Sequence, residues 1–214
     1  HQYMNNKNLI SLSLFSDPKK DKYINHIYNS IPIFKKYFTN FDICLFVDSS
    51  IITHSKYKQL LNFLVKNRDN YLRTNPKGHL TTSAWIINHK RDKILLHHHR
   101  SLDKWIQLGG HLEKQESIRE AVLREAREES GLNSLSVLEP KIFDLDVHKI
   151  PEFKDQAEHF HYDLRILLEA DAEEKLKRSS ESKNLKWIDS NEVKNYVGEE
   201  SVLRMVKKFN NFKF

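Results

Sequence analysis

The chain has 214 residues, of which 39% are hydrophobic and 30% charged, with one cysteine and a net charge of +6. This composition excludes a wholly disordered protein, a disulfide framework and a multi-cysteine zinc site, and no apolar run reaches the ~20 residues that span a bilayer. We therefore expect a cytoplasmic protein without membrane contact, built from one folded domain and an extension.

The first 75 residues are predicted to form an extension that is mostly helical from residue 17 to residue 73. Asp17-Pro18 is typical of a helix start, and leucine and valine recur at helical spacing over residues 60–65. Cys44 lies in an apolar run and is interpreted as a buried, unreactive thiol. The turn signal at Asn75-Pro76-Lys77-Gly78 predicts the boundary between an extension at 1–75 and a second domain at 76–214. The extension is expected to cap a site or to form an interface in a homodimer.

Beyond residue 76 the sequence alternates between short strands and helices. The expected elements are a hairpin of Leu80–Asn88 and Lys93–His98, an extended piece at Trp105–Leu108 ending in Gly109-Gly110, a helix at Ser117–Ser130, strands at Lys141–His148, His159–Leu168 and Leu185–Ile188, and a closing helix at Ser201–Phe209. Such strands with an embedded helix predict an α/β fold, a mixed β-sheet sandwiched between helices.

Three carboxylates share one face of the helix predicted at Ser117–Ser130. Glu125, Glu128 and Glu129 stand at i, i+3 and i+4, and like charges at this spacing destabilise a helix unless a cation lies among them. Carboxylate oxygens suit Mg²⁺ or Mn²⁺, which also bind the phosphate oxygens of a substrate. Gly109-Gly110 lets the backbone approach such an ion, so that a carbonyl can serve as a further ligand. A solvated helix face held by Glu–Arg pairs is the alternative interpretation.

The charge distribution suits an anionic ligand beside a cation site. Residues 1–112 contain 17 Lys and Arg against 7 Asp and no Glu, whereas residues 113–214 contain 18 Lys and Arg against 22 Asp and Glu. Solvated surface charge is the alternative explanation of a basic half next to a glutamate-rich half.

The spacing of the whole segment Gly110–Leu132 is a glycine, five residues, Glu116, seven residues, and then REAREESGL. This segment resembles the Nudix box, G-x5-E-x7-R-E-U-x-E-E-x-G-U, and departs from it only at the small Ala126, where a bulky aliphatic residue is usual. The resemblance extends in order of elements over residues 79–209. It implies a Nudix fold and a pyrophosphohydrolase that cleaves a nucleoside diphosphate linked to another group.

The same resemblance implies roles for individual residues. Glu128 and Glu129 become ligands of Mg²⁺ or Mn²⁺, and Glu125 a further ligand or the general base. Arg124 forms a structural pair with Glu116 at the catalytic centre. The predicted metal ligands are thus the three glutamates and the backbone of Gly109.

Many members of the family take one more carboxylate from a loop that follows the box. Glu181 is the first choice for this catalytic role, because it lies in a serine-rich loop just before the strand that holds Trp187. Glu158 and Asp163 are the alternatives, and plain exposed loop charge is the other interpretation of Glu181.

Two predicted strands carry matching polar faces. Their side chains alternate at i, i+2 and i+4, so each trio points to one side of its strand. The two trios are Asp144, Asp146 and His148, and His159, His161 and Asp163. If the strands pair, the six side chains meet on one surface, as a second metal site or a substrate pocket. A solvated sheet face with Asp–His hydrogen bonds is the alternative.

Three residues are candidates for substrate binding. Trp105, just before the box, can stack on a base or belong to the core. His98 points away from its neighbours in the His97–His99 run, and it either approaches the phosphates or is exposed at the strand end. Asp163 completes the set.

The substrate is expected to be a small nucleotide, with ADP-ribose, another nucleotide sugar or a nucleoside triphosphate as first choices. Dinucleoside polyphosphates and capped RNA remain open, whereas the sequence array of NADH-cleaving members is absent. A nucleotide- or RNA-binding regulatory protein without hydrolysis is the alternative function, and the complete box argues against it.

Overall fold

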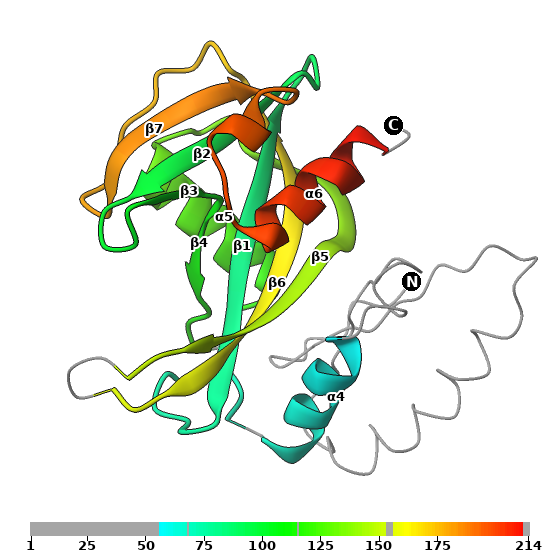
Figure 1. The fold of residues 1–214 in the computed structure, drawn as a ribbon, viewed down its shortest axis with the longest axis vertical. Helices are drawn as coiled ribbons and strands as arrows, with labels where there is room; N and C mark the ends of the chain where they lie inside the picture. Colours follow the sequence, from blue (N-terminus) through cyan, green and yellow to red (C-terminus); the bar gives the residue numbers. More distant parts are fainter. Residues whose placement is uncertain (1–55, 68, 115, 153–155, 212–214) are drawn as a thin grey trace, which may run out of the picture.

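The computed structural model of the protein describes residues 56–67, 69–114, 116–152 and 156–211. The predicted helix start at Asp17-Pro18 and the lone Cys44 lie outside these residues. The elements in chain order (Figure 1) are α4 (Tyr57–Lys66), β1 (Gly78–Asn88), β2 (Lys93–His99), β3 (Lys104–Ile106), β4 (Leu108–His111), α5 (Ile118–Ser130), β5 (Ser136–Ile150), β6 (His159–Ala170), β7 (Ser182–Asp189), the short η1 (Val193–Asn195) and α6 (Glu200–Asn210). Within the described ranges, every helix is too short or too polar to traverse a bilayer.

β1 is the centre of a seven-stranded mixed sheet whose main order is β3-β2-β1-β6-β5. Its second half pairs antiparallel with β2, with Ile86 opposite Leu95, and its first half pairs antiparallel with β4. β6 runs parallel to β1 along the whole strand and pairs antiparallel with β5, while β7 pairs antiparallel with β2. The predicted hairpin is therefore confirmed, and the two polar strands pair, which is the condition under which their polar faces meet.

The segment around Gly109-Gly110 differs from the prediction. It forms two short strands, β3 and β4, and the glycines lie inside β4 instead of ending a strand. Gly109 has a φ of 153°, and a Cβ at this position would stand 2.3 Å from the carbonyl oxygen of Thr82 on β1. A side chain would push β4 away from β1, so glycine is what allows the two strands to pair here.

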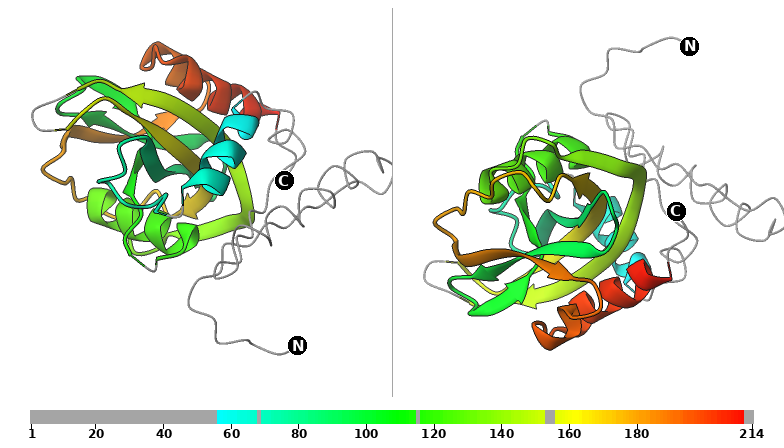
Figure 2. Two further views of the ribbon diagram at one scale, coloured as in Figure 1. Left: turned by 90° about the horizontal axis from the view of Figure 1, so that it is seen from below. Right: turned by 90° about the horizontal axis from the view of Figure 1, so that it is seen from above.

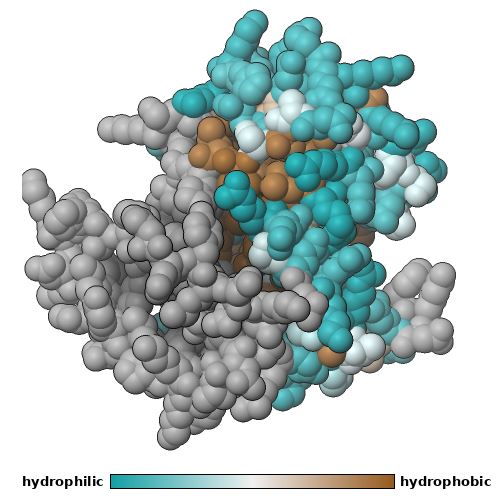
Figure 3. All heavy atoms as spheres, turned by 180° about the vertical axis from the view of Figure 1, so that it is seen from behind, coloured by the Kyte–Doolittle hydropathy of each residue, from teal (hydrophilic) through white to brown (hydrophobic). Residues whose placement is uncertain are grey.

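Helices cover both faces of the sheet, and apolar side chains fill the space beneath them. Leu80, Ala84 and Ile86 of β1 belong to a core that includes side chains of α4 and α5. Trp85 and Ile87 point the other way, into a core covered by α6. Figure 2 shows α5 and α6 on opposite sides of the sheet, and Figure 3 shows hydrophilic side chains over most of the described surface seen from behind. The predicted mixed sheet sandwiched between helices is confirmed.

Local signals fix both ends of α5. The hydroxyl of Ser117 accepts a hydrogen bond from the Glu120 N–H at 3.2 Å, and the Glu120 carboxylate accepts one from the Ser117 N–H at 2.8 Å. Gly131 ends the helix with a left-handed φ of 72°. Ala121 and Ala126 are fully buried against the sheet. With its ends capped and its small-residue face packed, the helix holds its remaining side chains in one orientation relative to the sheet.

α4 lies before the predicted domain boundary and still packs on the sheet. Leu60 and Phe63 are buried in the same core as α5, and the Phe63 ring stacks on Tyr162 of β6 with 4.0 Å between centroids. The helix ends at Lys66, because Asn67 is extended and its side-chain amide donates to the Phe63 carbonyl at 2.7 Å. Residues 69–73 form turns, so the prediction of a helix up to residue 73 is wrong there. The division of the chain at residue 75 stays a prediction.

Candidate active site

Two of the three glutamates of α5, Glu125 and Glu129, meet the glycines of β4. A Cβ at Gly110 would stand 2.4 Å from the carboxyl carbon of Glu125, so the carboxylate occupies the space that glycine leaves. The N–H of Gly109 donates to Oε2 of Glu129 at 2.8 Å. The side chain of Glu128 is 60% exposed, whereas those of Glu125 and Glu129 are 14% and 6% exposed. One carboxylate therefore faces solvent while two lie against the backbone of β4.

Arg124 braces this cluster from one side. Its Nε and Nη2 donate to the two carboxylate oxygens of Glu116 at 2.8 and 2.9 Å, and its Nη1 donates to Glu125 at 2.9 Å. Nη2 also donates to the backbone carbonyl of His111 at 2.9 Å. The hydrogen bond to Arg124 lowers the pKa of Glu116, and the same bond raises the pKa of Arg124. The arginine thus ties α5 to β4 and to the loop that precedes the helix.

The carboxylates of the cluster repel one another. Burial raises the pKa of Glu129 to about 8 and also raises the pKa of Glu125, and the charges of Glu128 and Glu181 act in the same direction. A divalent cation between these oxygens would favour the ionised carboxylates and reverse both shifts. The donor set consists of hard oxygens, which Mg²⁺ and Mn²⁺ prefer. The residues present therefore fit such an ion.

His97 is a neighbour of the glutamate cluster and was not among the residues predicted for the site. Its Nδ1 lies 2.7 Å from the hydroxyl of Ser182 and 4.0 Å from Oε1 of Glu129. Burial lowers the pKa of His97 to about 4, so the imidazole is neutral beside the carboxyl group. Strand alternation sends His97 and His98 to opposite sides of β2, and this alternation is the signal that could have identified His97.

His98 and Trp105, both predicted to bind substrate, contact each other away from the glutamates. Their rings stack with 5.3 Å between centroids, and Trp105 meets Tyr196 edge-on at 5.7 Å. Nε2 of His98 lies 3.0 Å from Asp103. Trp105 packs against the core beneath α6, so the pair lies on the opposite side of β2 from His97. The structure brings these two residues together and does not bring them to the carboxylates of α5.

The loop carboxylates differ in their surroundings. Glu181 is exposed immediately before β7, and its charge contributes to the raised pKa of both Glu125 and Glu129. Glu158, just before β6, forms an ion pair with Lys149 at 2.6 Å. Of these two glutamates, Glu181 is the one whose charge acts on the α5 cluster.

The polar faces of β5 and β6 meet. The expected Asp–His contact is present between Asp146 and His148 at 3.1 Å, but the aspartates are not solvated. Asp144, Asp146 and Asp163 are 2%, 4% and 3% exposed, and two arginines neutralise them. Nε of Arg165 donates to Asp163 at 2.8 Å, and Nη2 of Arg204 donates to Asp144 at 2.8 Å. Buried carboxylates need such partners, and Arg165 continues the alternation two residues after Asp163. Asp163, a candidate for substrate binding and for catalysis, therefore lies in a buried ion-pair network.

The raised pKa of Glu129 predicts how the stability of the metal-free protein depends on pH. Burial disfavours the charged carboxylate and raises the pKa of Glu129 in the folded protein to about 8, well above its ordinary value. As pH rises, the unfolded chain loses this proton at a lower pH than the folded protein does. The contribution of the protonated Glu129 to stability is therefore complete below the pKa of the unfolded chain and is lost as pH rises through the pKa of the folded protein. Glu129→Gln, which mimics the protonated carboxyl, should remove this loss. We expect its urea midpoint in EDTA to fall less than that of the wild type between about pH 5 and about pH 8.

Glu173→Gln is the matched control, because Glu173 is exposed and lies outside the cluster. It should keep the pH dependence of the wild type. Parallel curves for wild type and Glu129→Gln would contradict a buried, protonated Glu129.

The sequence and the fold of this chain are similar to those of known proteins. A family model described as the NUDIX domain matches residues 77–209. A relative described as a probable DHNTP pyrophosphohydrolase, from Lactococcus lactis subsp. cremoris (strain MG1363), is 32% identical over 102 residues, which are 47% of this chain and 59% of the relative. The chain thus spans less than two thirds of the length of that relative.

Similar solved structures include a hydrolase of the NUDIX family from Clostridium perfringens. It is 28% identical, with a TM-score of 0.47, and the match covers 62% of this chain and 96% of that one. The dihydroneopterin triphosphate pyrophosphohydrolase of E. coli is 16% identical with a TM-score of 0.48, and the match covers 61% of this chain and 93% of that one.

Proposed function

We propose that this chain, which belongs to the Nudix family, hydrolyses a phosphoric anhydride bond of a small nucleotide with the help of Mg²⁺ or Mn²⁺. The observation that carries the proposal is the contact of Glu125 and Glu129 with the glycines of β4. This contact brings together two largely buried carboxylates whose pKa values are raised. Groups with strongly shifted pKa values are found at functional sites more often than on solvated surfaces.

Glu125, Glu128 and Glu129 would hold the ion, with the carbonyl of Gly109 as a further ligand. When bound, Mg²⁺ or Mn²⁺ neutralises phosphate charge and acidifies the attacking water. The residues of the chain supply the positioning: Arg124 keeps the Glu125 carboxylate in place through its hydrogen bond at 2.9 Å. Glu128 is the solvent-facing carboxylate of the three, so it is placed to bind at the open side or to accept a proton from water.

For the substrate, we place nucleoside triphosphates and DHNTP ahead of ADP-ribose, because the Lactococcus lactis relative is named for DHNTP. A panel of these compounds, assayed with Mg²⁺ and with Mn²⁺ by separation of all products, tests the proposal; a triphosphate would release pyrophosphate or phosphate, and ADP-ribose would give AMP and ribose 5-phosphate. We expect a triphosphate to give the highest kcat/KM. Binding of these compounds without hydrolysis of any would favour a regulatory protein instead.

Glu181 is proposed as the mobile carboxylate that assists catalysis. Glu181 is an exposed loop carboxylate whose charge acts on the α5 cluster. Such a carboxylate can change position when the site closes on the substrate. Glu181→Gln should lower kcat by about 10- to 100-fold, leave the thermal midpoint nearly unchanged and flatten the acidic limb of the pH–rate profile.

Two variants serve as comparisons for this experiment. Glu158→Gln removes a carboxylate that is paired with Lys149, and Asp163→Asn removes one from the buried network. Full activity of Glu181→Gln together with a loss in either comparison, at an unchanged thermal midpoint, would move the role to that other residue.

A further inference from the structure

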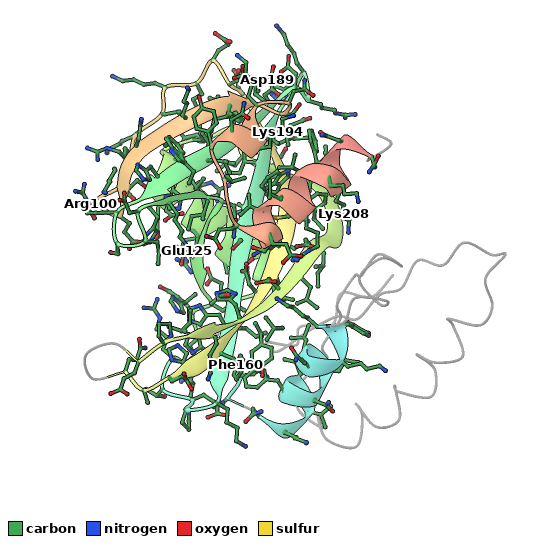
Figure 4. The ribbon with its side chains drawn as sticks, viewed as in Figure 1. Arg100, Glu125, Phe160, Asp189, Lys194 and Lys208 are labelled. Atoms are coloured by element: carbon green, nitrogen blue, oxygen red, sulfur yellow. The ribbon has the colours of Figure 1, made fainter. Side chains whose placement is uncertain are left out.

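Three histidines from two strands converge at a place that the proposed function does not use. They are His79 on β1 and His159 and His161 on β6, and one ring nitrogen from each lies within 4.8 Å of the others. The sheet register explains the meeting: His79 stands directly opposite His161 in the parallel pair, and His159 is two residues earlier on the same face of β6. Figure 4 labels Phe160, between the two histidines of β6, well below Glu125 and toward α4.

The ring nitrogens of this cluster are short of partners. His79 is fully buried, and neither of its nitrogens has a hydrogen-bond partner among the described residues. His159 is 5% exposed; its Nδ1 lies 2.8 Å from the carbonyl of Ala157, while its Nε2 is buried without a partner. The contact with a carbonyl requires the proton on Nδ1, which leaves the buried Nε2 as the nitrogen available to bind a metal. A backbone carbonyl that fixes the tautomer in this way is the usual outer support of a metal-binding histidine.

The surroundings of the three histidines add further donors. The ring of His111 lies 4.9 Å from that of His79, and the ring of His148 lies 5.6 Å from that of His161. His148 in turn contacts Asp146 at 3.1 Å, which brings a carboxylate to the edge of the cluster.

We propose that His79, His159 and His161 form a zinc site that is separate from the carboxylates of α5. Neutral imidazoles suit Zn²⁺, whereas Mg²⁺ and Mn²⁺ prefer the oxygen donors of the other site. Three histidines leave a fourth tetrahedral position for water or for His111. Because its ligands come from β1 and β6, the ion would link the beginnings of these two parallel strands. The zinc site stands independently of the proposed hydrolysis, since it shares no ligand with the α5 cluster.

The test is zinc binding by the tag-free 214-residue chain after removal of metals with a chelator. We expect competition titration to show one high-affinity Zn²⁺ in a Glu128→Gln/Glu129→Gln background, in which the carboxylate site is disabled. Co²⁺ loaded in place of Zn²⁺ should give the intense visible absorption of a tetrahedral ion. His161→Gln should weaken zinc binding by at least about 100-fold, since even the loss of an outer support costs 10- to 100-fold.

His79→Leu adds a readout that a merely structural histidine would not give. Leucine removes two unpartnered nitrogens, so in EDTA this variant should be at least as stable as the wild type to heat. With Zn²⁺ the wild type should gain thermal stability and the variant should not. His89→Gln is the matched control, because His89 is exposed near the β1–β2 turn and contacts Glu169. It should bind zinc like the wild type.

Two results would overturn the zinc site. One is that the Glu128→Gln/Glu129→Gln variant binds no Zn²⁺, because all of the zinc bound by the wild type is then held by the carboxylate site. The other is unchanged zinc affinity in both His161→Gln and His79→Leu. Neither result would bear on hydrolysis, which depends on the carboxylates of α5.

Discussion

Excess EDTA is expected to abolish hydrolysis by this protein, and added Mg²⁺ or Mn²⁺ to restore it. Glu125, Glu128 and Glu129 crowd one face of α5, and Arg124, the cation in contact with Glu125, also makes a bidentate contact with Glu116. Burial raises the pKa values of Glu125 and Glu129, and the neighbouring carboxylates add to both shifts. Phosphate oxygens would add more negative charge, so substrate can approach productively when a cation is present.

The measurement is steady-state turnover of the best substrate of the panel, first in EDTA and then after dialysis into each metal. Circular dichroism in EDTA serves as the control, because a folded but inactive protein separates loss of chemistry from loss of structure. Undiminished turnover by the folded protein in EDTA would contradict the assignment of the carboxylates as metal ligands.

The parts of this fold that the sequence predicted are those with local signals. α5 was expected at Ser117–Ser130 and spans Ile118–Ser130, because a capping box begins it and Gly131 ends it. The β1–β2 hairpin followed in the same way from two apolar runs joined by a short polar turn. The glutamate cluster could also be predicted, since three residues within one helical turn share a face whatever the rest of the chain does.

The parts that the sequence did not predict depend on contacts between distant segments. His79 joins the histidines of β6 only because β1 pairs parallel with β6 in the observed register, and a shift by one residue would turn His79 to the other face. Arg204 on α6 neutralises Asp144 across 60 residues of sequence, so the polar strand face is buried instead of solvated. No local pattern carries such a register, and the histidine cluster forms through it.

Glu128→Gln is expected to lower kcat at least about 100-fold, whether Glu128 binds the ion or accepts a proton from water. The loss should not come from unfolding. The Glu128 side chain is 60% exposed, and its contact with Arg124 at 3.5 Å is an exposed i,i+4 pair. Pairs of this kind contribute about 0–1 kcal/mol to stability, so the thermal midpoint should stay close to that of the wild type.

The comparison with other glutamates decides what the result means. Glu173→Gln changes the same functional group at an exposed position outside the cluster and should keep wild-type kcat. Glu129→Gln should also lose activity, but it alters a buried group that accepts the Gly109 N–H, so its stability must be measured at the same pH. A Glu128→Gln variant with nearly wild-type kcat would shift the chemistry to the buried pair, Glu125 and Glu129. A large loss at an unchanged midpoint would instead place the proton transfer or the ion at the solvent-facing side of α5, where a substrate can reach it without displacing β4.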